Sequence, residues 1–103
     1  MFGQVERFEF DAELWLYDGD SAWHFVTVPA DVSDEIEAVS SGARRGFGSV
    51  PVRVTVGATT WSTSLFPDTK RQAYLLPVKK EVRQREGVSA GSRLSVAVEL
   101  VDV

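Results

Sequence analysis

Cationic side chains gather in one stretch of an otherwise acidic sequence. Lys70 and Arg71 fall in an expected bend, and three more cations fall in a short helix soon after it. Small-ligand pockets combine apolar walls with a few polar groups. The candidate ligand-binding residues are therefore Lys70, Arg71, Lys79, Lys80, Arg83, Tyr74, Trp61 and Ser64. They favour a non-catalytic binding module for an anionic small molecule or an acidic protein segment.

These cations also have a structural explanation. Lys79, Lys80, Arg83 and Arg85 would sit on the solvated faces of a helix, with several near its C-terminus, where the helix dipole favours positive charge. The bend and the helix flank a strand at 73–76, which spans roughly 17 Å. The two groups of cations therefore line opposite rims, or converge on one end if the bend folds over.

Residue types that often perform catalysis are present without a catalytic pattern. The only histidine, His24, has no companion metal ligands, and Ser62 and Ser64 lack the Gly-x-Ser-x-Gly elbow of hydrolases. The acids Glu9, Asp11 and Glu13 form one stripe, which is more simply a solubilising strand face. We expect no catalytic residue, metal site or cofactor, although the sequence alone does not decide whether the protein is an enzyme.

Two further segments invite ligand interpretations. Asp18, Gly19 and Asp20 resemble part of a calcium loop but lack its remaining oxygen ligands, so they indicate a turn. The segment from Gly42 to Gly48 is rich in glycine and contains Arg44 and Arg45. It lacks the Gly-Lys-Ser/Thr ending of a phosphate loop and precedes a strand, so a connector is favoured over an anion site.

Composition limits the class of protein. The chain has 103 residues, which suits a single domain over 1–103, and it has no cysteine. Its start, MFGQVERFEF, is neither a basic leader nor an apolar run, which favours a cytoplasmic protein that does not span a membrane. The net charge of −4 opposes non-specific attraction to nucleic acid and anionic lipid.

Hydrophobic periodicity predicts a mainly β fold with two short helices. Alternating apolar and polar residues indicate strands at 8–16, 23–28, 50–56, 61–66, 73–76 and 94–100. One helix is expected after a cap at Asp31, with Val32, Ile36 and Val39 on one face; the other is expected to start at Pro77 and end at Gly87. So many strands in a short chain favour a small closed or nearly closed six-stranded β-barrel, which hides its edges.

The order of motifs resembles a bacterial family known as domain of unknown function 1905. The matching segments are Phe8-x-Phe10-x-Ala12, Val28-Pro29, Val52-Arg53-Val54-Thr55-Val56, Thr63-Ser64-Leu65-Phe66-Pro67, Tyr74-Leu75-Leu76-Pro77-Val78-Lys79, Val82-Arg83 and Gly87-Val88. The resemblance covers nearly the whole chain and implies a six-stranded barrel with no established activity, cofactor or catalytic residue. Family members often have Gly-Asp before the last strand, whereas this chain has Gly91-Ser92. An acid therefore cannot tie that turn here.

Two other functions compete with ligand binding. The basic helix, Arg44-Arg45 and a weak similarity of the last turn to barrels of bacterial transcription regulators suggest a nucleic-acid-binding or regulatory barrel. Alternatively, Trp15, Trp61 or Phe47 would be exposed and make this a self-associating accessory domain. Salt-dependent retention on DNA tests the first alternative. Sizing in solution tests the second.

Overall fold

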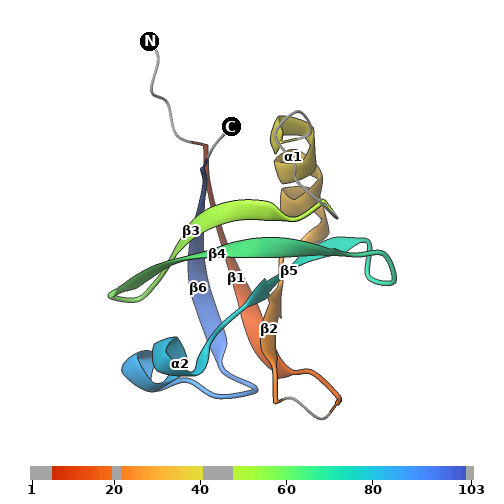
Figure 1. Ribbon diagram of the computed structural model, residues 1–103. Coiled ribbons are helices and arrows are strands. Elements are labelled where there is room, and N and C mark those ends of the chain that lie inside the picture. Colours follow the sequence, from red (N-terminus) through yellow and green to blue (C-terminus); the bar gives the residue numbers. More distant parts are fainter. Residues whose placement is uncertain (1–5, 20–21, 41–47, 102–103) are drawn as a thin grey trace.

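Six antiparallel strands close into a barrel in the order β1-β2-β5-β4-β3-β6 (Figure 1). The computed structural model describes residues 6–19, 22–40 and 48–101. Its elements are β1 (Arg7–Leu16), β2 (His24–Thr27), α1 (Ala30–Ser40), β3 (Val50–Val56), β4 (Thr59–Asp68), β5 (Ala73–Pro77), α2 (Lys80–Glu86) and β6 (Arg93–Leu100). The expected mainly β fold, a closed six-stranded barrel with two short helices, is therefore confirmed.

Strand β6 closes the barrel by pairing with β1 on one side and with β3 on the other. Val98 lies opposite both Phe8 of β1 and Val54 of β3. The alternation predicted for this strand is present, because Leu94, Val96, Val98 and Leu100 are all buried. Since successive side chains of a strand point to opposite faces, one register places all four inside the barrel.

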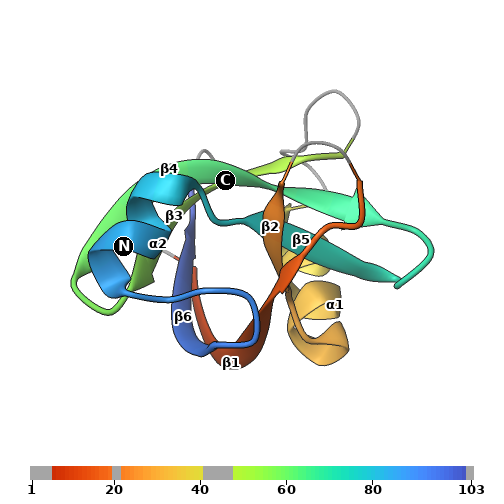
Figure 2. The ribbon, with the colours of Figure 1, turned by 90° about the horizontal axis from the view of Figure 1, so that it is seen from below.

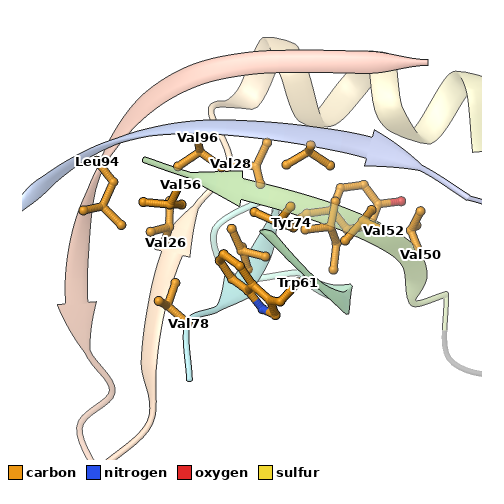
Figure 3. Close-up of a cluster of buried hydrophobic side chains, with 14 of the residues drawn as sticks. Val26, Val28, Val50, Val52, Val56, Trp61, Tyr74, Val78, Leu94 and Val96 are labelled. Atoms are coloured by element: carbon orange, nitrogen blue, oxygen red, sulfur yellow. The ribbon is translucent and has the colours of Figure 1, made fainter. Parts of the chain in front are cut away.

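Branched aliphatic side chains from every strand fill the interior (Figure 3). Val52 and Val54 from β3 are almost completely buried, as is Leu65 from β4. Trp61 and Tyr74 share this interior, with 8% and 4% of their surfaces exposed. The inside of the barrel is thus a packed core, and any ligand site on it must be sought near its rims or on its outer face.

Helix α1 packs beside β5 through a buried serine. The hydroxyl of Ser33 donates to the carbonyl oxygen of Val28 (3.1 Å) and accepts from the backbone N–H of Tyr74 (3.1 Å). The prediction that Ile36 and Val39 share a buried apolar face is partly wrong, because Ile36 is buried but Val39 is 42% exposed. Ser33 and Ser40 take buried positions instead, since small polar residues approach the barrel closely while bonding to nearby carbonyls.

The second helix begins later than the sequence suggests. Pro77 is the last residue of β5, where it lies opposite Phe25, and α2 starts at Lys80. Val78 donates its N–H to His24 on the β2 side, so the nitrogen of Pro77 faces the β4 side. The pairing of β5 with β4 ends at Leu75. Proline is tolerated in this strand because no partner there requires an N–H donor.

The C-terminal end of α2 is fixed by short contacts. At the C-terminal end, Gly87 adopts φ 64°, and the N–H of Val88 donates to the carbonyl of Arg83, which confirms the predicted glycine stop. Glu86 accepts hydrogen bonds from the Thr59 hydroxyl (2.6 Å) and the Ala58 N–H (3.3 Å). The helix is therefore tied to the turn between β3 and β4.

The turn before β6 is held by the side chain of Ser92, at the position where the resemblance suggests an aspartate. The hydroxyl oxygen of Ser92 accepts from the N–H of Ser89 (3.0 Å), and the N–H of Ser92 donates to the carbonyl of Ser89 (2.8 Å). Gly91 takes φ 99° in this turn. A hydroxyl thus supplies the side-chain acceptor that an aspartate would provide.

The two helices lie on opposite sides of the barrel, with α1 beside β5 and α2 beside β4 (Figures 1 and 2). The β4–β5 turn projects away from α2 (Figure 1). None of the helices in the described ranges is long and apolar enough to cross a membrane.

Candidate functional site

A small hollow between β2, β4 and α2 brings cationic and hydroxyl side chains together. Its volume is about 170 Å³, and its lining includes Trp23, His24, Ser62, Lys79 and Arg83. We call it the cationic pocket. Strand pairing creates this pocket. The connection from β5 to α2 lies beside the start of β2, because the N–H of Val78 donates to the carbonyl of His24 (2.9 Å).

Arg83 is the most constrained cation of the pocket. Its side chain projects from α2, and its Nε–H donates to the carbonyl oxygen of Val78 (3.1 Å) in a partly buried contact. Among the residues that the structure describes, no carboxylate lies within salt-bridge distance of its guanidinium. The terminal nitrogens of Arg83 are therefore held in position and remain available to an anion, which they suit by their forked geometry.

The other polar groups of the pocket come from β2, from β4 and from the residue before α2. Lys79 precedes α2 and makes an exposed ion pair with Glu81 (3.5 Å), a contact too solvated to bind the lysine firmly. His24 has its Nδ1 3.0 Å from the carbonyl oxygen of Ala22, which leaves Nε2 for other partners. Ser62 lies exposed on the outer face of β4.

Among the residues that the structure describes, the lining of the cationic pocket includes no aspartate or glutamate. Within the described ranges, two permanent cations therefore line the hollow together with His24 and Ser62, and no carboxylate does. Trp61 supplies apolar wall from the core side, where it is 8% exposed. Such a lining attracts negative charge and places hydrogen-bond donors around it.

Lys70 and Arg71 occupy a separate groove at the other end of β5. This groove, of about 670 Å³, runs between the end of β1 and the β4–β5 turn, and it includes Asp18 and Asp68 as well as the two cations. Arg71 also places its guanidinium carbon 4.5 Å from the ring centroid of Trp15. The structure therefore divides the expected basic cluster into two sites.

Asp68 neutralises Arg71 within that groove. The Arg71 guanidinium donates to the Asp68 carboxylate, which also accepts from the backbone N–H groups of Arg71 and Lys70 (3.4 and 2.9 Å). These bonds hold the pKa of Asp68 below its ordinary value. Because Arg71 already has a carboxylate partner, we expect this groove to bind anions more weakly than the cationic pocket.

The remaining candidates lie away from the cationic pocket. Tyr74 is buried, and it borders a third cavity of about 480 Å³ beside α1 that also contains Asp34 and Glu37. Ser64 is half-buried opposite Pro51 on the outer face of the barrel, and Lys80 is exposed at the start of α2. Within the described ranges, the hydroxyl of Tyr74 is buried and has no hydrogen-bond partner.

Several sequence-based interpretations fall outside the described residues. They concern Asp20, Arg44, Arg45 and Phe47, and with them most of the candidate phosphate loop. Of the tryptophans proposed for self-association, Trp61 is buried and Trp15 is half-buried beneath Arg71. In the described ranges, no group of three or more histidine, cysteine, aspartate or glutamate side chains is arranged to hold a metal ion.

Comparison with protein families decides the relationship of this chain. The family described as Domain of unknown function (DUF1905) matches residues 10–98. The chain belongs to this family. The DUF1905 match includes every residue of the cationic pocket named above. A comparison with curated proteins finds no match to this chain.

For this DUF1905 member, the sequence pointed to Lys79, Arg83 and Trp61 but not to their partners. The sequence suggested a metal or catalytic role as the alternative to a surface position for His24, and a catalytic role for Ser62. The structure places both at the cationic pocket, where Nδ1 of His24 lies near the carbonyl of Ala22. For Trp23, the sequence predicted only a position at the start of a strand. The missing signal was the pairing of β2 with β5, which carries residues 22–24 to the start of α2.

Proposed function

We propose that this protein is a non-catalytic binding module that holds a small anion in the cationic pocket. The observation that carries the proposal is Arg83, a partly buried arginine fixed by the Val78 carbonyl and without a carboxylate partner in the described part of the chain. Burying part of an arginine without an acid is costly unless another partner neutralises it. A bound anion would be that partner.

The size and composition of the pocket define the anionic group. Its volume of about 170 Å³ lies below the roughly 300 Å³ at which clefts for drug-sized ligands begin. A phosphate or a carboxylate suits this space, because each accepts two bonds from an arginine fork and further bonds from lysine, histidine and serine. The acidic segment of a protein partner would use the same chemistry through one side-chain carboxylate.

The proposal is tested by titrating the isotope-labelled protein with inorganic phosphate at constant ionic strength. We expect saturable chemical-shift changes at the backbone amides of Ser62, Lys79 and Arg83. Arg83→Gln should weaken binding by about tenfold to a hundredfold, because one charge-assisted hydrogen bond contributes about 1.5–3 kcal/mol. Lys79→Gln serves the same purpose if the first variant does not fold.

Arg53→Gln is the matched control. It removes the same charge from the outer face of β3, where Arg53 lies 3.6 Å from Glu99, so its effect on phosphate affinity should be less than twofold. Equal weakening by the Arg83 and Arg53 variants would mean general electrostatic attraction and would overturn the proposal. So would a titration in which no pocket amide shifts.

We also propose that the domain works in the cytoplasm. A chain without cysteine has no disulfide to form in an oxidising compartment. Fractionation of cells that produce the tagged protein tests this, and recovery outside the cytoplasmic fraction would contradict it.

A further inference from the structure

An exposed tryptophan stands on the rim of the cationic pocket. Trp23 is 51% exposed and precedes β2 directly. Its ring stacks on Phe25, with centroids 5.8 Å apart and planes 9° from parallel. Since one ring face is covered and half of the surface is still exposed, Trp23 presents a flat aromatic platform to solvent.

This platform is supported from below by other aromatic rings. Phe25 lies 5.4 Å from Trp15 and 6.0 Å from Tyr17, measured between ring centroids. Trp15 is anchored in turn, because its Nε1–H donates to the hydroxyl of Thr27 (2.9 Å). The orientation of Trp23 is therefore set by packing on the outer face of β1 and β2, so a ligand would not have to order this side chain.

The backbone beside Trp23 is also in an uncommon conformation. Ala22 has φ 55°, in the left-handed region, although it is not glycine. In this conformation its carbonyl oxygen lies 3.0 Å from Nδ1 of His24. One short segment thus places both the histidine in the pocket and the tryptophan on its rim, and left-handed non-glycine residues are concentrated at functional sites.

The pocket is too small to enclose an organic phosphate completely. At about 170 Å³ it accommodates the anionic group, and the rest of the ligand molecule must remain outside the pocket, against its rim. On the rim stands Trp23, whose exposed ring favours a flat aromatic group over an aliphatic one. Stacking of nucleobases on aromatic side chains is a common source of affinity and tolerates any base.

From this arrangement we propose that the ligand is a nucleoside monophosphate. Its phosphate binds Arg83, Lys79, His24 and Ser62, and its base stacks on Trp23. This inference rests on the proposed function, because it identifies the molecule to which the bound anionic group belongs. Recognition of the base is by stacking alone, so purine nucleotides should bind more tightly than pyrimidine nucleotides.

The test compares adenosine 5′-monophosphate, ribose 5-phosphate, inorganic phosphate and adenosine by calorimetry on the intact protein. We expect the nucleotide to bind about tenfold more tightly than ribose 5-phosphate, since stacking supplies the difference. Trp23→Leu should remove this difference. Tyr17→Leu is the matched control, because Tyr17 is 47% exposed in the same aromatic cluster but does not line the cationic pocket.

Each result separates the inference from the proposed function. If phosphate, ribose 5-phosphate and the nucleotide bind equally, the nucleotide inference is wrong and the anion pocket stands. If adenosine binds as tightly as its monophosphate, the phosphate contacts are wrong and both proposals fail. Both also fail if none of the four compounds binds. A nucleotide preference that survives Trp23→Leu would show that Trp23 is not the platform.

Discussion

At the scale of single residues, the two arginines at opposite ends of β5 are distinguished by their partners. Arg71 is neutralised by Asp68 and stacks on Trp15, whereas Arg83 is fixed only by a backbone carbonyl within the described residues. In sequence both are simply cations beside one strand. The difference comes from Asp68, which is near Arg71 in the chain, whereas Arg83 donates to the carbonyl of Val78.

The ion pair between Arg71 and Asp68 can be tested by measuring the pKa of Asp68. The hydrogen bond from the Arg71 side chain, aided by backbone N–H groups, lowers that pKa from its ordinary value. A group with a lowered folded-state pKa contributes stability above its unfolded-state pKa and loses it as the pH falls through the folded-state pKa. We expect an NMR titration to show Asp68 ionised at lower pH than an ordinary aspartate.

Arg71→Ala should raise the pKa of Asp68 toward the ordinary value, because the largest favourable contact is lost. Lys70→Ala should change this pKa little, since Lys70 acts on Asp68 through its backbone N–H, which the variant keeps. The same titration curve for wild type and Arg71→Ala would contradict the assigned ion pair.

At the scale of secondary-structure elements, α2 is positioned by its contact with the β3–β4 turn. Gly57 has φ 58° in that turn, and a Cβ added there would overlap the Glu86 carboxylate. Glycine is therefore required twice, for its backbone conformation and for the close approach of Glu86. The hydrogen bond from Thr59 to Glu86 depends on this approach.

We expect Gly57→Ala to destabilise the protein more than Gly87→Ala. Both glycines have left-handed φ values, 58° and 64°, so both substitutions carry a conformational cost of about 1–2 kcal/mol. Gly87 has no atom within 4 Å of an added Cβ, so only the Gly57 variant also loses the Glu86 contact, at about another 1 kcal/mol. Urea unfolding of the two variants measures the difference.

A Glu86→Ala background provides the control for this comparison. With the carboxylate gone, Gly57→Ala and Gly87→Ala should cost the same free energy of unfolding. If the two substitutions are already equal in the wild-type background, Glu86 does not hold α2 to the turn.

The elements themselves were largely predictable, because alternation along strands is a local signal. Val50 to Val56 and Leu94 to Leu100 show the period of two in the sequence and the same inward face in the structure. Trp61 lies on the same strand face as Leu65, and this spacing indicates that Trp61 is buried. We did not make that prediction from the sequence. Pro77 was misplaced because its suitability depends on where the pairing of β5 with β4 ends, a property of two distant segments.

The candidate site was predicted less completely for the same reason. Lys79 and Arg83 were identified from local composition, but the residues facing them come from β2 and β4, far away in sequence. Only the barrel order, in which β5 lies between β2 and β4, brings Trp23, His24 and Ser62 to α2. Local patterns specify strands well and their neighbours in a closed sheet poorly.

At the scale of the whole molecule, β2 is the shortest strand in the described part of the barrel. β2 pairs with β1 only through 14–16 and with β5 only through 75–77, whereas β3 pairs with β4 along 50–56. Regions with few backbone pairs open at lower free energy than the rest of a structure. Because β2 carries the residues that enter the cationic pocket, opening of the barrel and loss of the site should be linked.

Hydrogen exchange checks this expectation. The backbone amides of β2 should exchange at least about tenfold faster than those of β3, corresponding to a difference of about 1.4 kcal/mol in opening free energy. Saturating phosphate should slow exchange in β2 more than in β3. Uniform protection of all six strands would mean that the barrel opens only as one unit.

The position of β6 between β1 and β3 has a consequence for synthesis of the protein. Until this strand leaves the ribosome, each of its neighbours lacks a partner along one edge, and their inward valines and phenylalanines remain partly uncovered. Such margins are templates for association between chains. A nascent chain arrested just before residue 93 should therefore depend on chaperones, whereas the released chain completes its sheet and no longer needs them.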